Sequence, residues 1–163
     1  MAYNNNEVRF SHNGKPFSFQ NLVYLIEQTS TKERKQDTEQ GKEIKTTGKY
    51  GTGFMTTNLL SKMVLIEGVV YDDIKMLFVK FKLSMNRNAK TPEEMIDNIE
   101  KSINQLTDQL NKGGQNPLKF YVVGNDLDTT FTYKLENEES RQTARIGIED
   151  LKKNITTTLS FLD

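Results

Sequence analysis

Apolar residues recur along the chain with two periods, and each period predicts a different kind of element. Runs rich in apolar and β-branched residues predict strands at residues 7–11, 62–71, 75–83, 118–123, 129–135 and 155–162. Apolar residues spaced by three and four predict helices directly after Ser18, between Thr91 and Gly113, and at residues 141–154. These elements predict an α+β fold, a two-layer sandwich with helices packed on one mixed or antiparallel sheet.

The first strand leads into a turn and then a helix. In the sequence His12-Asn13-Gly14-Lys15-Pro16, the Asn-Gly pair can supply a positive φ, and the proline fixes φ near about −65°. Ser18 can cap the helix that follows, whose apolar face comprises Phe19, Leu22, Val23 and Ile26. The turn therefore sits at the carboxyl edge of a strand, where ligands bind in α/β sheets.

The helix expected after Thr91 has a strong start signal. Thr91 is the expected N-cap, Pro92 occupies the first helical position, and Glu94 completes a capping box. An apolar stripe then comprises Ile96, Ile99, Ile103, Leu106 and Leu110. We expect this stripe to pack on the domain's own sheet rather than form a dimer seam, because about two to three heptads are too few for a coiled-coil dimer.

Near the C-terminal end, Ala144, Ile148 and Leu151 are expected to face inward from the third helix, before a closing strand. Asp72 and Asp73 are expected to form a turn between two strands, in preference to a paired-carboxylate metal site.

A long polar stretch interrupts this pattern at residues 28–47, where Ile44 is the only large apolar residue. Such a stretch cannot bury enough surface to order itself cheaply, and long loops in compact domains are lids, binding loops or disorder. We expect a mobile lid, because the stretch leads directly into a cluster of glycines.

The glycine cluster is the segment Gly48-Lys49-Tyr50-Gly51-Thr52-Gly53-Phe54, followed by a helix expected at residues 54–60. A glycine turn that opens a helix presents free backbone N–H groups and the positive end of the helix dipole, both of which attract phosphate. The spacing is neither the dinucleotide fingerprint nor a Walker motif. An ordinary glycine-rich turn is the alternative interpretation of this segment alone.

Composition narrows the class of protein. The 163 residues suit one domain, with 22 basic and 22 acidic side chains and a formal net charge of zero. This balance disfavours a nucleic-acid or polybasic membrane surface. The absence of cysteine and the single His12 exclude thiolate and histidine-rich metal sites. No signal peptide and no apolar run near ~18 residues is present, so a cytoplasmic protein is expected.

Taken in order, these motifs resemble the GHKL ATPases, which share the Bergerat ATP-binding fold. The glycine cluster, the helix after it and the strand containing Val64-Leu65-Ile66 are most similar to the chaperone and sacsin-like branch. The resemblance covers most of the chain and implies a single, partial ATP-binding domain at residues 1–163, with ATP as its ligand and Mg²⁺ as a possible companion.

The resemblance also implies roles for individual residues. His12, Asn13 and Gly14 stand where the family has its adenine-reading turn, and either Thr129 or Thr130, of which we favour Thr130, matches a threonine near the adenine. The remaining matches belong to the start of the lid (Ser30, Thr31 and Lys32) and to the phosphate-binding box (Gly48, Lys49, Tyr50, Gly51, Thr52, Gly53 and Phe54).

The sequence departs from the family in two places. His12 replaces an aspartate and Pro16 replaces a glycine, which puts adenine selectivity in question. The family's first box, a helix with a glutamate base and a magnesium-binding asparagine, has no match in the eleven residues before His12. We therefore expect a chain truncated at its N-terminus or one that has lost hydrolysis, with no catalytic residue of its own.

Three functions stay open at this point. The chain is the nucleotide-binding part of a GHKL-type ATPase, a non-hydrolysing regulatory relative with a degenerate site, or a ligand-free scaffold that acts by protein contact. A homodimer or flanking domains of a larger protein are the possible protein partners, and neither a membrane nor nucleic acid is expected.

Overall fold

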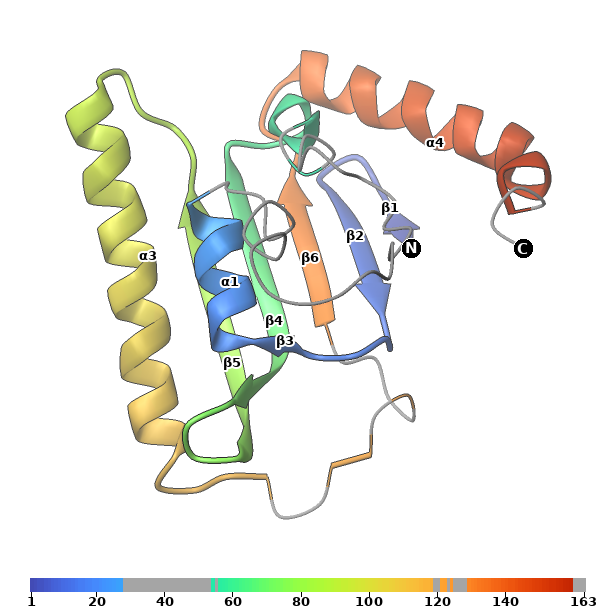
Figure 1. Ribbon diagram of the computed structural model, residues 1–163. Helices are drawn as coiled ribbons and strands as arrows, with labels where there is room; N and C mark the ends of the chain where they lie inside the picture. Colours follow the sequence, from blue (N-terminus) through green and yellow to red (C-terminus); the bar gives the residue numbers. More distant parts are fainter. Residues whose placement is uncertain (28–53, 55, 119–120, 123, 125–128, 160–163) are drawn as a thin grey trace, which may run out of the picture.

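The computed structural model describes residues 1–27, 54, 56–118, 121–122, 124 and 129–159, with the backbone alone for 155–159. In this part of the chain, helices are packed against one mixed sheet, which confirms the predicted α+β sandwich (Figure 1). The strands are β1 (Ala2–Tyr3), β2 (Glu7–His12), β3 (Phe17–Ser18), β4 (Met63–Asp72), β5 (Leu77–Asn86) and β6 (Thr129–Lys134). The helices are α1 (Phe19–Ile26), the short 3-10 helix η2 (Thr57–Leu59), α3 (Pro92–Gly113) and α4 (Glu138–Leu159).

Strand β4 is the centre of the sheet. One of its edges pairs with β5 along its whole length, and the other pairs first with β6 and then with β3. Strand β6 continues the sheet to β2 and β1. The pair β3–β4 is parallel and all the other pairs are antiparallel, so the sheet is mixed.

Strand pairing determines which side chains share a face. Phe10 of β2 lies opposite Phe131 of β6, which lies opposite Ile66 of β4, which lies opposite Leu83 of β5. Side chains alternate along a strand, so every second residue from these positions points to the same side. This face, called the core face below, includes Phe10 and His12 of β2, and most of its other residues are buried: Val8, Val64, Ile66, Val70, Val79, Phe81, Leu83, Met85, Thr129, Phe131 and Tyr133.

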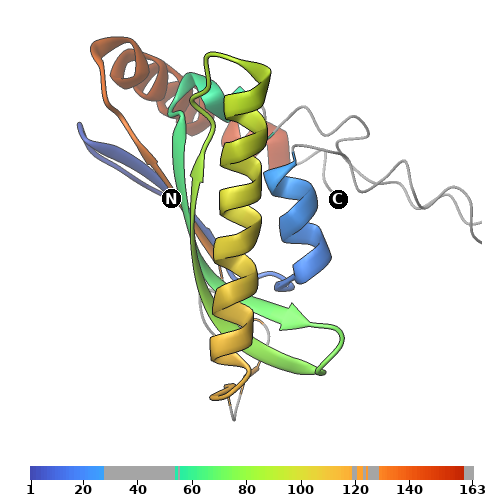
Figure 2. The same ribbon diagram turned by 90° about the vertical axis from the view of Figure 1, so that its left-hand side faces the viewer.

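Helix α1 lies over the core face in front of β4, as seen in Figure 1 and from the β5 side in Figure 2. Its expected N-cap is confirmed, because Ser18 Oγ accepts a hydrogen bond from Asn21 N at 3.2 Å and Asn21 Oδ1 accepts one from Ser18 N at 3.3 Å. Leu22 and Ile26 fix the helix on the sheet because both side chains are fully buried.

Helix α3 begins as its sequence predicts, with one change in detail. Thr91 Oγ1 accepts a hydrogen bond from Glu94 N at 3.2 Å, and Pro92 follows the cap. Glu94 Oε2, however, accepts from Lys90 N at 2.7 Å, one residue before the cap. The glutamate therefore binds the backbone N–H of the residue before the cap. The capping-box prediction had it bind the backbone N–H of Thr91, the cap residue itself.

Two glutamines of α3 occupy the outer edge of the sheet. Gln109 accepts a hydrogen bond from Lys82 N at 2.7 Å and donates one to Lys82 O at 2.6 Å. Gln105 accepts from Ser84 N at 3.2 Å. An open edge strand invites pairing with another chain, and these side chains satisfy β5 instead. Figure 2 shows α3 running along this edge.

The structure corrects the predicted stripe of α3. Leu106 and Leu110 are buried and Ile99 and Ile103 pack at the margin of the core, as expected for packing on the domain's own sheet. Ile96 is 55% exposed and takes no part.

Helix α4 also differs from its prediction. It begins earlier than expected and continues through residues 155–159, where a closing strand was predicted. Ala144 is buried and Ile148 packs at the core margin, but Leu151 is 40% exposed. A helix propagates more easily than it nucleates, so a formed helix can overrule the β propensity of a threonine-rich continuation.

The remaining differences are local. Gly14 does not have a positive φ; among the described residues only Met76 and Gly124 do, at 55° and 86°. The described residues of the segment 118–123 are not in a strand, although Leu118 N donates to Phe78 O of β5. The turn predicted at Asp72 is confirmed, since its Oδ1 accepts from both Ile74 N and Lys75 N at 3.0 Å.

Two helical glycines provide a matched test of this packing. A Cβ on Gly113 would overlap the Val79 side chain, whereas a Cβ on Gly147 would meet nothing within 4 Å. Gly113→Ala should lower the free energy of unfolding by about 1–3 kcal/mol, because Val79 is buried and β-branched. Gly147→Ala should raise it by about 0.5–1 kcal/mol. Urea denaturation followed by circular dichroism checks both values, and a destabilising Gly147→Ala would contradict the position of α4.

Among the residues that the structure describes, no helix combines the length and the apolar character needed to cross a membrane.

Candidate functional site

The motif residues that the structure describes come from three distant parts of the chain. His12 ends β2, Phe54 precedes η2, and Thr129 and Thr130 begin β6. Asn13 and Gly14, which follow His12, are also described. The remaining matched residues lie outside the described part of the chain: Ser30, Thr31, Lys32, Gly48, Lys49, Tyr50, Gly51, Thr52 and Gly53. The predicted lid at 28–47 also lies outside it.

The ring of Phe131 joins these three parts. The His12 ring stacks near it, with centroids 6.4 Å apart, and the Phe54 ring meets it edge-on at 6.2 Å. Phe10 and Phe17 complete the group at 6.5 and 6.3 Å from Phe131. These five rings are called the aromatic cluster below. Sequence reasoning missed the cluster because its members are distant along the chain.

The threonine that accompanies His12 is Thr129. It is the direct cross-strand partner of His12, so their side chains lie on the same face. Thr129 is fully buried, and its Oγ1 has no hydrogen-bond partner among the described residues.

Thr130, the threonine favoured from the sequence, points to the opposite face. There its Oγ1 and Ser11 Oγ form a hydrogen bond of 2.9 Å. Because side chains alternate along β6, Thr130 cannot join His12, and the assignment of that role to Thr130 does not fit the fold.

Asn13 connects the end of β2 to the segment before β6. Its Nδ2 donates to the carbonyl of Gly124 at 3.2 Å. Gly124 has a φ of 86°, which favours glycine because other residues rarely adopt this conformation. Gly14 follows Asn13, and a Cβ added to it would lie 3.4 Å from His12 Nδ1. This corner therefore places the imidazole of His12 beside a turn.

The helix predicted after the glycine cluster is a short helical segment. Phe54 and Thr56 are helical, η2 follows, and Leu60 N and Ser61 N both donate to Thr57 O. Thr57 Oγ1 donates back to Phe54 O at 2.6 Å.

A buried arginine holds this segment in place. Arg87 Nη1 donates to Thr57 Oγ1 at 3.0 Å and to Phe54 O at 3.4 Å, and Nη2 donates to Ser61 O at 2.7 Å. Its guanidinium also lies 5.1 Å from the centroid of the Phe54 ring, within cation–π range.

Burial affects the ionisation of two groups here. Desolvation lowers the pKa of Arg87, although an arginine stays charged at neutral pH. Burial raises the pKa of Tyr133, against the smaller effects of a hydrogen bond with Thr57 and of the nearby Arg87 charge. The sequence offers no signal for Arg87, because it lies between two asparagines after a strand and is typical there of a surface turn.

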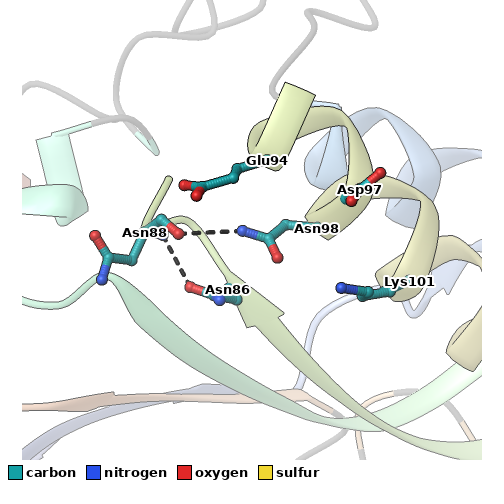
Figure 3. Close-up of a pocket in the computed structure, with 6 residues that line it drawn as sticks. All are labelled: Asn86, Asn88, Glu94, Asp97, Asn98 and Lys101. Carbon is teal, nitrogen blue, oxygen red and sulfur yellow. Dashed lines mark hydrogen bonds between the residues drawn. The ribbon is translucent and has the colours of Figure 1, made fainter. Parts of the chain in front are cut away.

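A polar pocket lies elsewhere, between the end of β5 and the start of α3 (Figure 3). Asn88 is central to it, donating its N–H to Asn86 Oδ1 and accepting from Asn98 Nδ2. Glu94, Asp97 and Lys101 complete the lining. The three asparagines of the pocket bind one another. Within the described residues no group of three or more His, Cys, Asp or Glu could hold a metal ion.

Comparison of the chain with models of protein families, with curated proteins and with solved structures gave no match in any of the three.

Proposed function

We propose that this chain binds ATP on the core face of its sheet, in the manner of the GHKL ATPases that its sequence resembles, with negligible hydrolysis of its own. The observation that carries the proposal is the convergence at Phe131. His12, Phe54 and the strand that begins with Thr129 belong to three separate motifs of the resemblance, and the fold brings all three to one ring.

The chemistry of the cluster suits the base of a nucleotide. Aromatic rings offer stacking faces for a purine, and Thr129 Oγ1 is a buried hydroxyl that lacks a partner among the described residues. Buried polar groups are normally hydrogen-bonded, so an unpaired hydroxyl favours a polar ligand beside it.

In the proposal, the phosphates are bound by Gly48, Gly51 and Gly53, with Lys49, Tyr50 and Thr52 beside them. Free backbone N–H groups in a glycine turn bind phosphate. Ser30, Thr31 and Lys32 would start the lid. Mg²⁺ would arrive with the nucleotide, and we assign no residue of this chain as its ligand.

A thermal shift measurement tests the proposal. Saturating ATP with Mg²⁺ should raise the unfolding temperature by about 5 °C or more, because a ligand at 100 times its Kd stabilises by about 2.7 kcal/mol. Gly51→Val should abolish this shift without changing the unfolding temperature of the free protein, because a side chain there obstructs the phosphate turn and not the core.

Two results would contradict the proposal. The first is a parent protein whose unfolding temperature does not respond to ATP, and the second is a Gly51→Val variant that responds as strongly as the parent. Phosphate release from the parent should equal that from Gly51→Val, since no base for water is assigned in the chain. A higher rate in the parent would mean that such a base exists and would revise the hydrolysis part alone.

A further inference from the structure

We propose that His12 and Thr129 make the base end of this site tolerant of guanine as well as adenine, so that the chain binds purine nucleotides with little preference between the two. The inference rests on the proposed function and adds base specificity to it. His12 is the residue that determines this specificity.

The surroundings of His12 favour a flat aromatic ligand. Its ring lies 6.0 Å from Phe10, 6.1 Å from Phe17 and 6.4 Å from Phe131. Phe10 is 45% exposed, so one side of the aromatic cluster is open to solvent. Stacking on such rings is strongest for large bases, and it does not distinguish adenine from guanine, because every base has a π-face.

Discrimination between the two purines must therefore come from polar groups, and the core face supplies two beside these rings. His12 and Thr129 are cross-strand partners, and Thr129 Oγ1 has no hydrogen-bond partner among the described residues. Thr129 is fully buried, so its Oγ1 gains most from a ligand that offers a polar edge.

Both groups can donate as well as accept. A neutral imidazole has one N–H and one acceptor nitrogen, and a hydroxyl has one hydrogen and two lone pairs. Adenine presents an amino group where guanine presents a carbonyl oxygen, so a reader must accept from the first and donate to the second. Because an imidazole and a hydroxyl can reorient to do either, this pair does not force a choice.

A carboxylate at the same position would behave differently. It only accepts hydrogen bonds, so when held beside the six-position of the purine it would bind the amino group of adenine and repel the carbonyl of guanine. His12→Asp should therefore convert a tolerant site into one selective for adenine.

The experiment is titration calorimetry of the full chain with ATP, GTP and CTP, for the parent and for His12→Asp. The parent should bind ATP and GTP within about threefold of each other and CTP about tenfold more weakly, because a pyrimidine stacks over less area. His12→Asp should keep ATP and lose about tenfold or more in GTP affinity, since mismatched polar groups are rejected strongly.

Ser11→Ala is the matched control. Ser11 is the neighbour of His12 on β2, but it points to the opposite face and bonds to Thr130. This variant should leave the ratio of ATP to GTP affinity unchanged.

The outcomes separate the inference from the proposed function. If the parent binds ATP more tightly than GTP by a factor of about 30 or more, the inference is wrong and the proposal of ATP binding stands. If ATP, GTP and CTP bind with equal affinity, the aromatic cluster does not bind the base of the nucleotide. A His12→Asp variant with the parent's ratio removes His12 as the determinant, and a parent that binds no nucleotide removes the proposed function together with the inference.

Discussion

Leu106→Ala is expected to lower the free energy of unfolding by about 3 kcal/mol, within the roughly 2–5 kcal/mol observed for large-to-small changes in protein cores. The Leu106 side chain has no exposed surface and belongs to the same buried cluster as Leu83 and Met85 of β5 and Leu22 of α1. Truncation removes buried methyl groups and leaves a cavity between a helix and a sheet that are both fixed by other contacts. Urea denaturation with fluorescence and circular dichroism gives the midpoint and the slope.

Ile96→Ala is the matched control on the same helix. Ile96 is 55% exposed, so its truncation should change the free energy of unfolding by no more than about 0.5 kcal/mol. If both variants lost the same free energy of unfolding, the side chains of the whole stripe, Ile96 included, would be buried in solution. Ile96 would then lie in a contact between copies of the chain, and the assignment of the stripe to the domain's own core would be incomplete.

The sequence predicts the existence of α3 well and its buried face less well. The stripe taken from the sequence advances by three and four residues in alternation, whereas the buried line is Ser102, Leu106 and Leu110. At about 100° per residue, Ile96 lies about 80° around the helix from Leu106. Hydrophobic periodicity does not detect the buried position of Ser102, because serine is polar. Its burial is tolerated because its Oγ donates a hydrogen bond to Asn98 O within the helix.

Strands were predictable where alternation and turn chemistry agree. The strand pair β4–β5 follows from an apolar, strand-forming run before Asp72 and an alternating stretch after it, and the Asp72 carboxylate builds the turn. The strand predicted at 155–162 failed because β propensity describes a side chain that already has a sheet to pack in. In the structure, residues 155–159 of this stretch continue helix α4, which started at Glu138.

The candidate site was predictable in its parts but not in its assembly. His12 and a threonine at 129 or 130 could be singled out from the sequence, but the pairing of His12 with Thr129 depends on β2 lying beside β6, which is a contact between distant segments. The choice between Thr129 and Thr130 depends on strand register, because a shift of one residue exchanges the two faces. Register is not contained in either strand alone.

Arg87 is the functional candidate that sequence reasoning missed, and its replacement should have the second large effect. Arg87→Met is expected to lower the free energy of unfolding by about 2 kcal/mol. The change removes the guanidinium donors of Thr57 Oγ1 and Ser61 O, whereas Phe54 O keeps the hydrogen bond from Thr57 Oγ1. The loss is moderated because a desolvated charge, whose pKa burial lowers, disappears as well.

The local effect of this change should be larger than its global effect. The guanidinium holds the Phe54 ring from one side while Phe131 meets it from another. Amide hydrogen exchange at Leu60 and Ser61, which both donate to Thr57 O, should therefore accelerate more than exchange in β4. Arg87→Lys keeps the charge but lacks the planar fork, so it should show most of the same acceleration.

Arg145→Met supplies the control for a lost arginine charge, because Arg145 is exposed on α4. It should change neither the unfolding free energy beyond about 0.5 kcal/mol nor the exchange of residues 57–61. If Arg87→Lys restored slow exchange in full, the positive charge alone would hold the segment, and the hydrogen-bonded fork would be incidental. If Arg87→Met left exchange at Leu60 and Ser61 unchanged, the Phe54 segment would be held by its own helical bonds, and Arg87 would have no role in positioning the aromatic cluster.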